Sequence, residues 1–198
     1  MTTGEVQKIA VPAGKIATVA THLEMRAAPA PRPGPSDASL SVQLVAKPGL
    51  DWYRAMFRAV GTDWLWFSRL GLGDGDLGAI LGHDRVDVYA LTRDKREIGF
   101  AELDGRQFPD IELAFFGLVA EAIGTGAGRL LMNAALEAAW ASRPQRVWVH
   151  TCTFDHPDAV AFYLRSGFTV FARTVEIEDD PRLIGTLPRG AAPDVPIV

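Results

Sequence analysis

The sequence lacks features on which several classes of protein depend. Its 198 residues include a single cysteine, Cys152, so no disulfide forms within the chain, and this favours a reducing compartment. No run approaches the roughly 18 apolar residues of a membrane-spanning helix. Pro12, Gly14 and Lys15 interrupt the segment where a signal peptide would need an apolar stretch. We therefore expect a soluble cytoplasmic protein with no membrane partner.

Positive charge is also scarce. The chain has 20 Lys and Arg residues against 24 Asp and Glu residues, which gives a formal net charge of −4. Non-specific nucleic-acid binding needs a basic face, so no nucleic-acid partner is expected. The hydrophobic share of 48% and the charged share of 22% are typical of a globular protein with an apolar core.

Proline-rich segments divide the chain. Residues 28–37 read APAPRPGPSD, which excludes a helix or a central strand and predicts an extended linker. We expect a strand-like extension and linker at 1–38, a main domain at 39–180 and a flexible tail at 181–198. The extension contains KIATVATHLEM, a predicted strand that pairs either within the domain or across the two subunits of a homodimer.

The main domain alternates strand-like and helix-like stretches. From Ser39 the expected order is a strand, two helices, three strands that turn back on one another, a helix, a strand, a helix and a strand. Asp51 is expected to cap the first helix, and DWLWFSRLG at 63–71 to resume a helical pattern. This order predicts an α+β or mixed α/β fold.

Alternating glycines precede the Ala- and Leu-rich helix, in the loop Gly124–Gly128. Free N–H groups and the helix dipole attract anions at such a position. A Walker A loop needs Lys followed by Ser or Thr after its last glycine, whereas Arg129 and Leu130 stand here. A dinucleotide fingerprint needs glycine at 129 and a parallel sheet, so a dinucleotide-dependent oxidoreductase is a disfavoured alternative.

Together with later segments, the loop resembles the GNAT acetyltransferases. IGTGAG at 123–128 is similar to the family's coenzyme A loop, Q/R-x-x-G-x-G/A. DAVAFYLRSGF at 158–168 matches its A-x-x-x-Y-x-x-x-G-F helix, and VWVHTC with DHP resembles bacterial members. The resemblance runs from Ser39 to about Asp179. It implies a mostly antiparallel twisted sheet, splayed between its fourth and fifth strands and flanked by helices. Ile123 departs from the family's Arg or Gln, and His156 stands at the usual Asn position.

The resemblance implies acetyl transfer from acetyl-CoA to a primary amine of a small molecule or protein, by direct attack in a ternary complex. The loop's N–H groups then hold the pyrophosphate and the main chain of Leu118 and Ala120 pairs with the pantetheine arm. Tyr163 gives a proton or a hydrogen bond to the departing sulfur. The implied cofactor-binding residues are Leu118, Ala120, Ile123, Gly124, Thr125, Gly126, Ala127, Gly128, Arg129, His156, Ala159 and Phe162.

Glu112 is the leading candidate for the base that deprotonates the amine. In histone-type members of the family a glutamate stands at the same offset before the loop, and poor solvation in IELAFF favours a proton acceptor near neutral pH. Glu102 is the runner-up, and water alone is a further alternative. Trp64 or Trp66 is a candidate to bind a cationic amine, with Asp63 as counter-charge, although both tryptophans also fit a core or lid.

The sequence allows two other interpretations. His150, Cys152, Asp155 and His156 match no standard zinc spacing, so no metal is expected. Because Ile123 replaces a cationic or amide residue, a non-catalytic acyl-CoA-binding sensor is the alternative to an enzyme.

Overall fold

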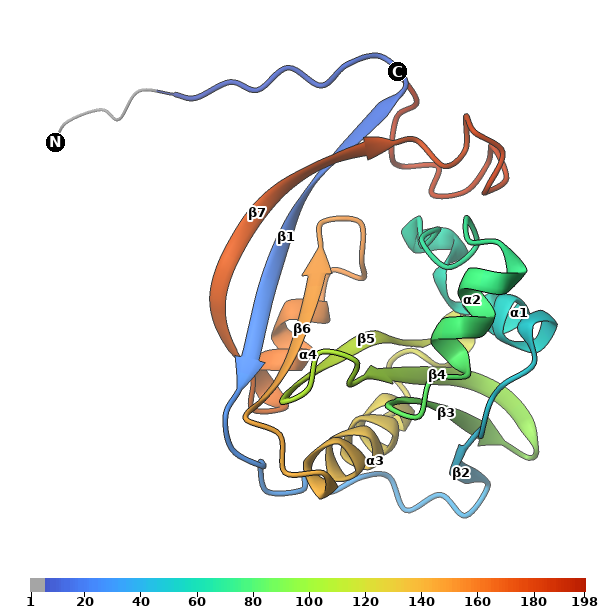
Figure 1. Cartoon of the computed structure of the whole chain (residues 1–198), viewed down its shortest axis with the longest axis vertical. Coiled ribbons are helices and arrows are strands. Elements are labelled where there is room, and N and C mark those ends of the chain that lie inside the picture. Colours follow the sequence, from blue (N-terminus) through green and yellow to red (C-terminus); the bar gives the residue numbers. More distant parts are fainter. Residues whose placement is uncertain (1–5) are drawn as a thin grey trace, which may run out of the picture.

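The computed structural model describes residues 6–198, through which one mixed sheet extends (Figure 1). Its strands are β1 (Lys15–Met25), β2 (Leu40–Leu44), β3 (Val86–Arg93), β4 (Arg96–Asp104), β5 (Asp110–Leu118), β6 (Arg146–Cys152) and β7 (Thr169–Asp179). They lie in the order β2-β3-β4-β5-β6-β1-β7. All neighbouring pairs are antiparallel except β5 and β6, which run parallel. The expected mostly antiparallel sheet is confirmed.

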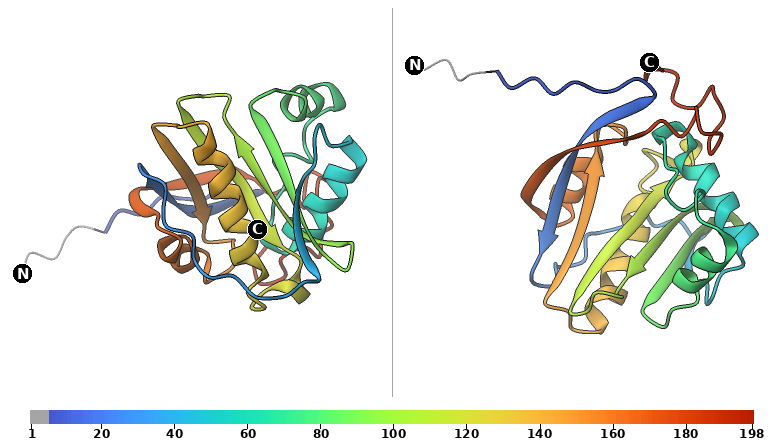
Figure 2. Two further views of the ribbon diagram at one scale, coloured as in Figure 1. Left: turned by 90° about the horizontal axis from the view of Figure 1, so that it is seen from below. Right: turned by 45° about the horizontal axis from the view of Figure 1, so that its top comes forward.

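Helices cover both faces of the sheet (Figures 1 and 2). They are α1 (Leu50–Gly61), α2 (Asp74–Leu81), α3 (Ala127–Ala141) and α4 (Ala159–Arg165), with short 3-10 turns η1 (Thr62–Trp64) and η2 (Ala120–Ala122). Helix α1 buries Tyr53, Met56, Phe57 and Val60, whose spacing places them on one helical face. Its ring contacts reach Phe100 of β4 and Phe115 of β5, so α1 holds the sheet next to the site described below.

Two local predictions near α1 were wrong. Gly49 is the residue before the helix, and Asp51 lies within the first turn instead of capping it. The helical pattern expected at 63–71 yields only η1, after which Leu65 takes a left-handed conformation (φ 56°). The chain turns there because Trp66 packs back against Phe57 and Phe115, and this tertiary contact overrides the local helical pattern.

Strand β1 lies inside the sheet, between β6 and β7. Its His22 is opposite His150 of β6 and Ala172 of β7, so both edges of β1 are paired. Of the two arrangements that the sequence left open, pairing within the chain is the one observed. The sheet thus includes β1, which precedes the boundary expected at residue 38. The sequence did not indicate this pairing, because strand propensity does not specify which strands become neighbours.

The C-terminal segment after β7 folds back onto the molecule, in contrast to the flexible tail expected from its prolines. Arg182 is buried against Asp180 (2.7 Å). It also donates to the backbone carbonyls of Ala191, Ala192 and Val195. One arginine therefore satisfies carbonyl groups in a segment that forms no helix or strand. Within residues 6–198, no helix has the length and apolar character needed to cross a membrane.

Candidate functional site

Strands β5 and β6 separate soon after they begin to pair. Their parallel register covers only Asp110–Glu112 opposite Arg146–Trp148. A cavity of about 910 Å³ lies where they diverge, lined by both strands, α4, the loop before α3 and residues 28–32 of the linker. A cavity of this size accommodates a ligand as large as a cofactor.

At one end of the cavity lies the glycine loop that precedes α3. Gly124 and Gly126 have positive φ angles, 79° and 86°, a conformation that other residues rarely adopt. Within the described part of the chain, the N–H groups of Gly124, Gly126 and Gly128 donate no hydrogen bond. These donors at the start of a helix of 15 residues are suited to an anion.

Tyr163 of α4 lines the cavity and is only 6% exposed. Its ring packs against Phe116 and Phe168. Its hydroxyl has no hydrogen-bond partner among residues 6–198. Burial, together with the charge of Asp155, holds the pKa of Tyr163 well above its ordinary value of 10.0. The phenol is therefore protonated at neutral pH and available as a donor to a ligand.

Asp155 ties residues 64–68 after α1, which we call the lid, to the end of β6. Its Oδ1 accepts a hydrogen bond from Trp66 Nε1 (2.9 Å). Its Oδ2 accepts from the Thr151 hydroxyl (2.7 Å) and the Cys152 N–H (2.9 Å). Trp64 packs edge-on against His156, with ring centroids 5.4 Å apart. The segment 64–68 therefore lines the cavity and is held beside the end of β6.

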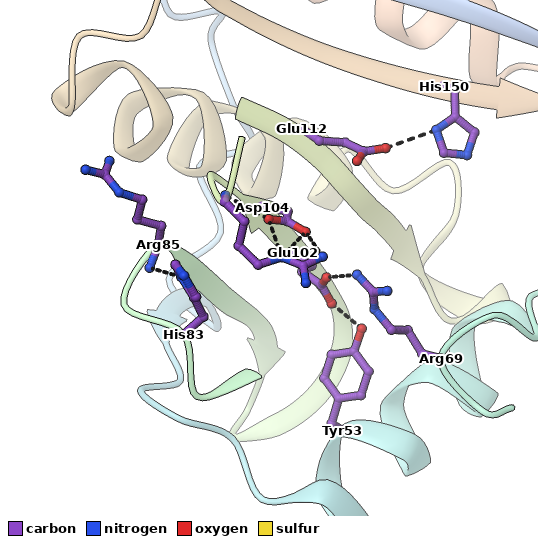
Figure 3. A network of polar contacts seen from close by, with 9 residues as sticks. Tyr53, Arg69, His83, Arg85, Glu102, Asp104, Glu112 and His150 are labelled. Carbon is purple, nitrogen blue, oxygen red and sulfur yellow. Dashed lines mark hydrogen bonds and ion pairs between the residues drawn. The ribbon is translucent and has the colours of Figure 1, made fainter. Parts of the chain in front are cut away.

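Glu112 is paired with a histidine that lines the cavity. Glu112 Oε1 lies 3.1 Å from His150 Nδ1, across the point where β5 and β6 stop pairing (Figure 3). The hydrogen bond to Glu112 raises the pKa of His150 above its ordinary value. Burial opposes this increase, and the charges of Glu112, Glu176 and Asp155 add to it. The pair places a titratable imidazole at the cavity and a carboxylate behind it.

Glu102, the runner-up base, is occupied elsewhere. Its side chain is fully buried, and its Oε2 accepts a hydrogen bond from the Tyr53 hydroxyl while Oε1 binds Arg69 (2.6 Å; Figure 3). The Arg69 guanidinium also lies over the Phe115 ring, 5.1 Å from its centroid. Glu102 does not line the cavity. It instead fixes Arg69, the residue that follows the lid.

The cavity gathers most of the residues expected from the sequence. Twelve of them line it: Trp64, Trp66, Leu118, Ile123, Gly124, Gly126, Gly128, Arg129, His156, Ala159, Phe162 and Tyr163. Asp63, Glu112, Ala120, Thr125 and Ala127 do not. Ala127 faces the core and Ala120 lies in the turn η2, whereas the Thr125 hydroxyl turns back to the Ala122 carbonyl. Asp63 lies in η1, directly before the lid.

Sequence reasoning missed several lining residues. The sequence suggested His150 only as a potential metal ligand. His150 stands two residues after Trp148, which pairs with Glu112, so it lies on the same face of the sheet just beyond the last paired residues. Glu176 and Glu178 of β7 reach the cavity because β1 brings β7 close to it. The sequence did not indicate that linker residues 28–32 line the cavity, since proline predicts an extended chain but not its location. Among residues 6–198, no group of three or more potential ligands is arranged to hold a metal ion.

Comparison with known sequences gives one match. Residues 50–168, more than half of the chain, match the sequence model of the Acetyltransferase (GNAT) family. No match was found among curated proteins. The matched region includes the cavity's lid, glycine loop and Tyr163 helix, and it leaves out β1, the linker and β7.

Solved structures share the fold at low sequence identity. A conserved protein of unknown function from Staphylococcus epidermidis has a TM-score of 0.53 and 15% identity, covering 84% of this chain and 64% of that one. An aminoglycoside acetyltransferase from an uncultured soil metagenomic sample has a TM-score of 0.55 and 14% identity, covering 66% of this chain and 89% of that one. A GCN5-related N-acetyltransferase from Sphaerobacter thermophilus has a TM-score of 0.59 and 12% identity, covering 82% of this chain and 52% of that one. The chain thus spans less than two thirds of the first and the last of these proteins.

Proposed function

Because this chain belongs to the GNAT acetyltransferase family, we propose that it transfers an acetyl group from acetyl-CoA directly to a primary amine. The observation that carries this proposal is the cavity of about 910 Å³ at the β5–β6 splay. It joins three elements that such a reaction needs: free N–H donors for a phosphate group, a buried protonated phenol, and a titratable histidine. The proposed domain spans residues 39–180, with β1 added to its sheet.

We assign the coenzyme to the groove between the glycine loop and α4. The N–H groups of Gly124, Gly126 and Gly128 would bind the pyrophosphate. The pantetheine arm is peptide-like, and beyond Glu112 the edge of β5 that faces β6 has no strand partner in the described chain. Its backbone around Leu118 is thus free to pair with the arm as a strand would. Ala120 is not part of this edge, because it lies in η2.

Tyr163 is assigned to the departing sulfur. An ordinary thiol has a pKa of about 8.5, well below that of a tyrosine. Since burial raises the pKa of Tyr163 further, a thiolate would not remove its proton. The phenol then stabilises the negative sulfur through a hydrogen bond, and the thiolate later takes a proton from solvent.

The His150–Glu112 pair is assigned to the amine. The ammonium loses one proton to Nε2 of neutral His150, and the free amine nitrogen forms a bond to the thioester carbon as the carbon–sulfur bond breaks. The second proton on that nitrogen passes to solvent as the amide forms. Glu112 orients the ring through Nδ1 and is a positioning residue in this scheme. The proton thus reaches the carboxylate's partner, and Glu112 itself need not face the cavity.

Negative charges on the His150 side of the cavity favour a cationic acceptor. They belong to Glu176, Glu178 and Asp155, which line the cavity. The lining arginines that the structure describes belong instead to the linker, α3 and α4. A small-molecule amine and a protein amino group are both compatible with this arrangement, and Trp64 and Trp66 then act as part of the lid.

The test is release of free thiol from acetyl-CoA against a panel of amines. Tyr163→Phe should slow turnover by roughly 10²–10³-fold, the range for loss of one donor that stabilises a developing negative charge. Tyr89→Phe is the matched control, since Tyr89 is half-buried on β3 and outside the cavity. Turnover of Tyr163→Phe at the wild-type rate would remove Tyr163 from the mechanism. Coenzyme A binding without turnover of any amine would favour the sensor instead.

A further inference from the structure

The linker between β1 and β2 crosses the coenzyme end of the cavity. We call residues 28–35 the strap. It leaves the end of β1 and passes α3 on its way to β2 (Figures 1 and 2). Residues 28–32 line the cavity, so the strap forms part of its wall.

The strap is fastened to the first turns of α3. The Arg129 guanidinium donates to the Pro33 carbonyl (2.8 Å), and the Asn133 amide donates to the Arg32 carbonyl (2.7 Å). Pro35 lies against Gly126, where an added Cβ would meet its ring at 3.8 Å. These contacts place Arg32 close to the loop that carries the free N–H groups.

The strap is also fastened to the end of α4. Arg32 Nη1 donates to the Arg165 carbonyl (3.0 Å). Pro29 packs on Gly167, where an added Cβ would lie 3.2 Å from the proline ring. Arg32 therefore spans the groove between the two helices, although it is far from both in the sequence.

Three guanidinium groups line this part of the cavity and pair with no carboxylate of the described chain. They belong to Arg32, Arg129 and Arg165. Within residues 6–198, none of them has a carboxylate oxygen within 4.0 Å, and the nearby lining residues Glu137 and Asp158 form no ion pair with them. Like charges gathered in this way repel one another, and a polyanionic ligand would relieve that repulsion.

We propose that Arg32 of the strap binds the 3′-phosphate of coenzyme A and makes the protein select the coenzyme over forms that lack this phosphate. The inference rests on the proposed function. Coenzyme A carries a diphosphate and a separate phosphomonoester. The glycine loop supplies donors for the diphosphate, so the monoester needs a second cationic partner. Arginine suits phosphate because its planar guanidinium binds two oxygens at once. Ile123 offers no such group, and the strap brings one from outside the family-matched region.

The experiment compares coenzyme A with dephospho-coenzyme A, which differ only in the 3′-phosphate, by calorimetry on the full chain. The wild type should prefer coenzyme A. Arg32→Ala should weaken coenzyme A binding by about tenfold or more and leave dephospho-coenzyme A unchanged, as expected for a lost charge-assisted contact. Arg32→Lys should restore part of the preference. Arg26→Ala is the matched control, because Arg26 pairs with Glu24 and lies outside the cavity lining.

The outcomes separate this inference from the proposed function. If the wild type binds neither compound, the proposed function fails. If the wild type prefers coenzyme A and Arg32→Ala keeps that preference, the role of Arg32 is overturned while the function stands. An equal loss for both compounds would also overturn it, because the 3′-phosphate would then not be the group that Arg32 contacts. Thermal unfolding of each variant without ligand checks that the fold is intact.

Discussion

Glu102 and Glu112 lie on neighbouring strands of one sheet but have opposite surroundings (Figure 3). Glu102 on β4 is fully buried, with one oxygen bound to Tyr53 and the other to Arg69. The Glu112 side chain on β5 is 24% exposed, and its Oε1 lies 3.1 Å from Nδ1 of His150. The His150 side chain is 43% exposed and lines the cavity. The same side chain is therefore a structural anchor at one site and part of a titratable pair at the other.

Access to water and to a ligand explains the difference. A carboxylate whose oxygens are both occupied in the core has little room to exchange a proton with substrate. Burial, with the charge of Glu102, also raises the pKa of Tyr53 well above 10.0, so this tyrosine stays a donor. His150 has solvent and cavity on one side and a carboxylate on the other. Its protonation can change without breaking the core.

The largest expected effect comes from removing the buried carboxylate. Glu102→Gln leaves the Arg69 guanidinium without its ionic partner in a buried site, which costs about 3–5 kcal/mol of unfolding free energy. Urea denaturation measures this change. Glu97→Gln, an exposed position on the same strand, should change stability by less than about 0.5 kcal/mol. A loss below about 1 kcal/mol for Glu102→Gln would contradict its role as an anchor.

Removing the imidazole at the cavity should show the reverse pattern. His150→Gln keeps a polar side chain of similar size, so the folded state is retained, but turnover should fall roughly 10²–10⁴-fold because the proton acceptor is lost. Thiol release at saturating acetyl-CoA measures it. His22→Gln is the control, since the ring centroids of His22 and His150 are 5.9 Å apart but His22 lies outside the cavity lining. Equal losses in both variants would indicate that His150 acts through packing.

The two glutamates show how far the sequence could be interpreted. GFAELDG and IELAFF each present one carboxylate among apolar residues, and both were candidates for the base. What separates them are partners 33 to 49 residues away, Arg69 and Tyr53 for one and His150 for the other. Local patterns predict the strands and the long helix after the glycines, because these depend on near neighbours.

The same reasoning explains the other differences. The β-branched residues in 15–25 predict a strand, but its position between β6 and β7 depends on long-range pairing. Proline in the linker predicts an extended chain without indicating the groove that it crosses. The burial of Arg182 depends on carbonyls that only the folded tail brings together. In each case the missing information is a contact partner, and no local pattern contains it.

A smaller effect is expected from the tyrosine of the buried network. Tyr53→Phe keeps the ring that packs on Phe57 and Phe100 and removes only the hydroxyl that donates to Glu102. Loss of a hydrogen bond to a charged group should cost about 1.5–3 kcal/mol of unfolding free energy. Activity of the folded enzyme should stay near the wild-type value. A fall in turnover without loss of stability would mean that the network also acts on the chemistry.

The smallest change, and the sharpest test of the comparison, is Glu112→Gln. His150 must be neutral to accept a proton, so kcat/KM should rise with pH through the pKa of His150, which Glu112 holds above its ordinary value of 6.5. Without that carboxylate the pKa falls, although Glu176 of β7, Asp155 after β6 and His22 of β1 still face the ring. The rising limb should therefore move to lower pH.

The plateau of the same profile should fall by roughly tenfold, because a less basic and less fixed imidazole is a poorer acceptor. Stability should change by less than about 1 kcal/mol, as for other partly exposed pairs. Profiles of the wild type and Glu112→Gln from acid to alkaline pH measure both effects. If the limb stays in place while the plateau falls, Glu112 does not set the pKa of the group that accepts the proton. The pairing of Glu112 with His150 would then have no part in the titration, and its assigned role in the comparison would be overturned.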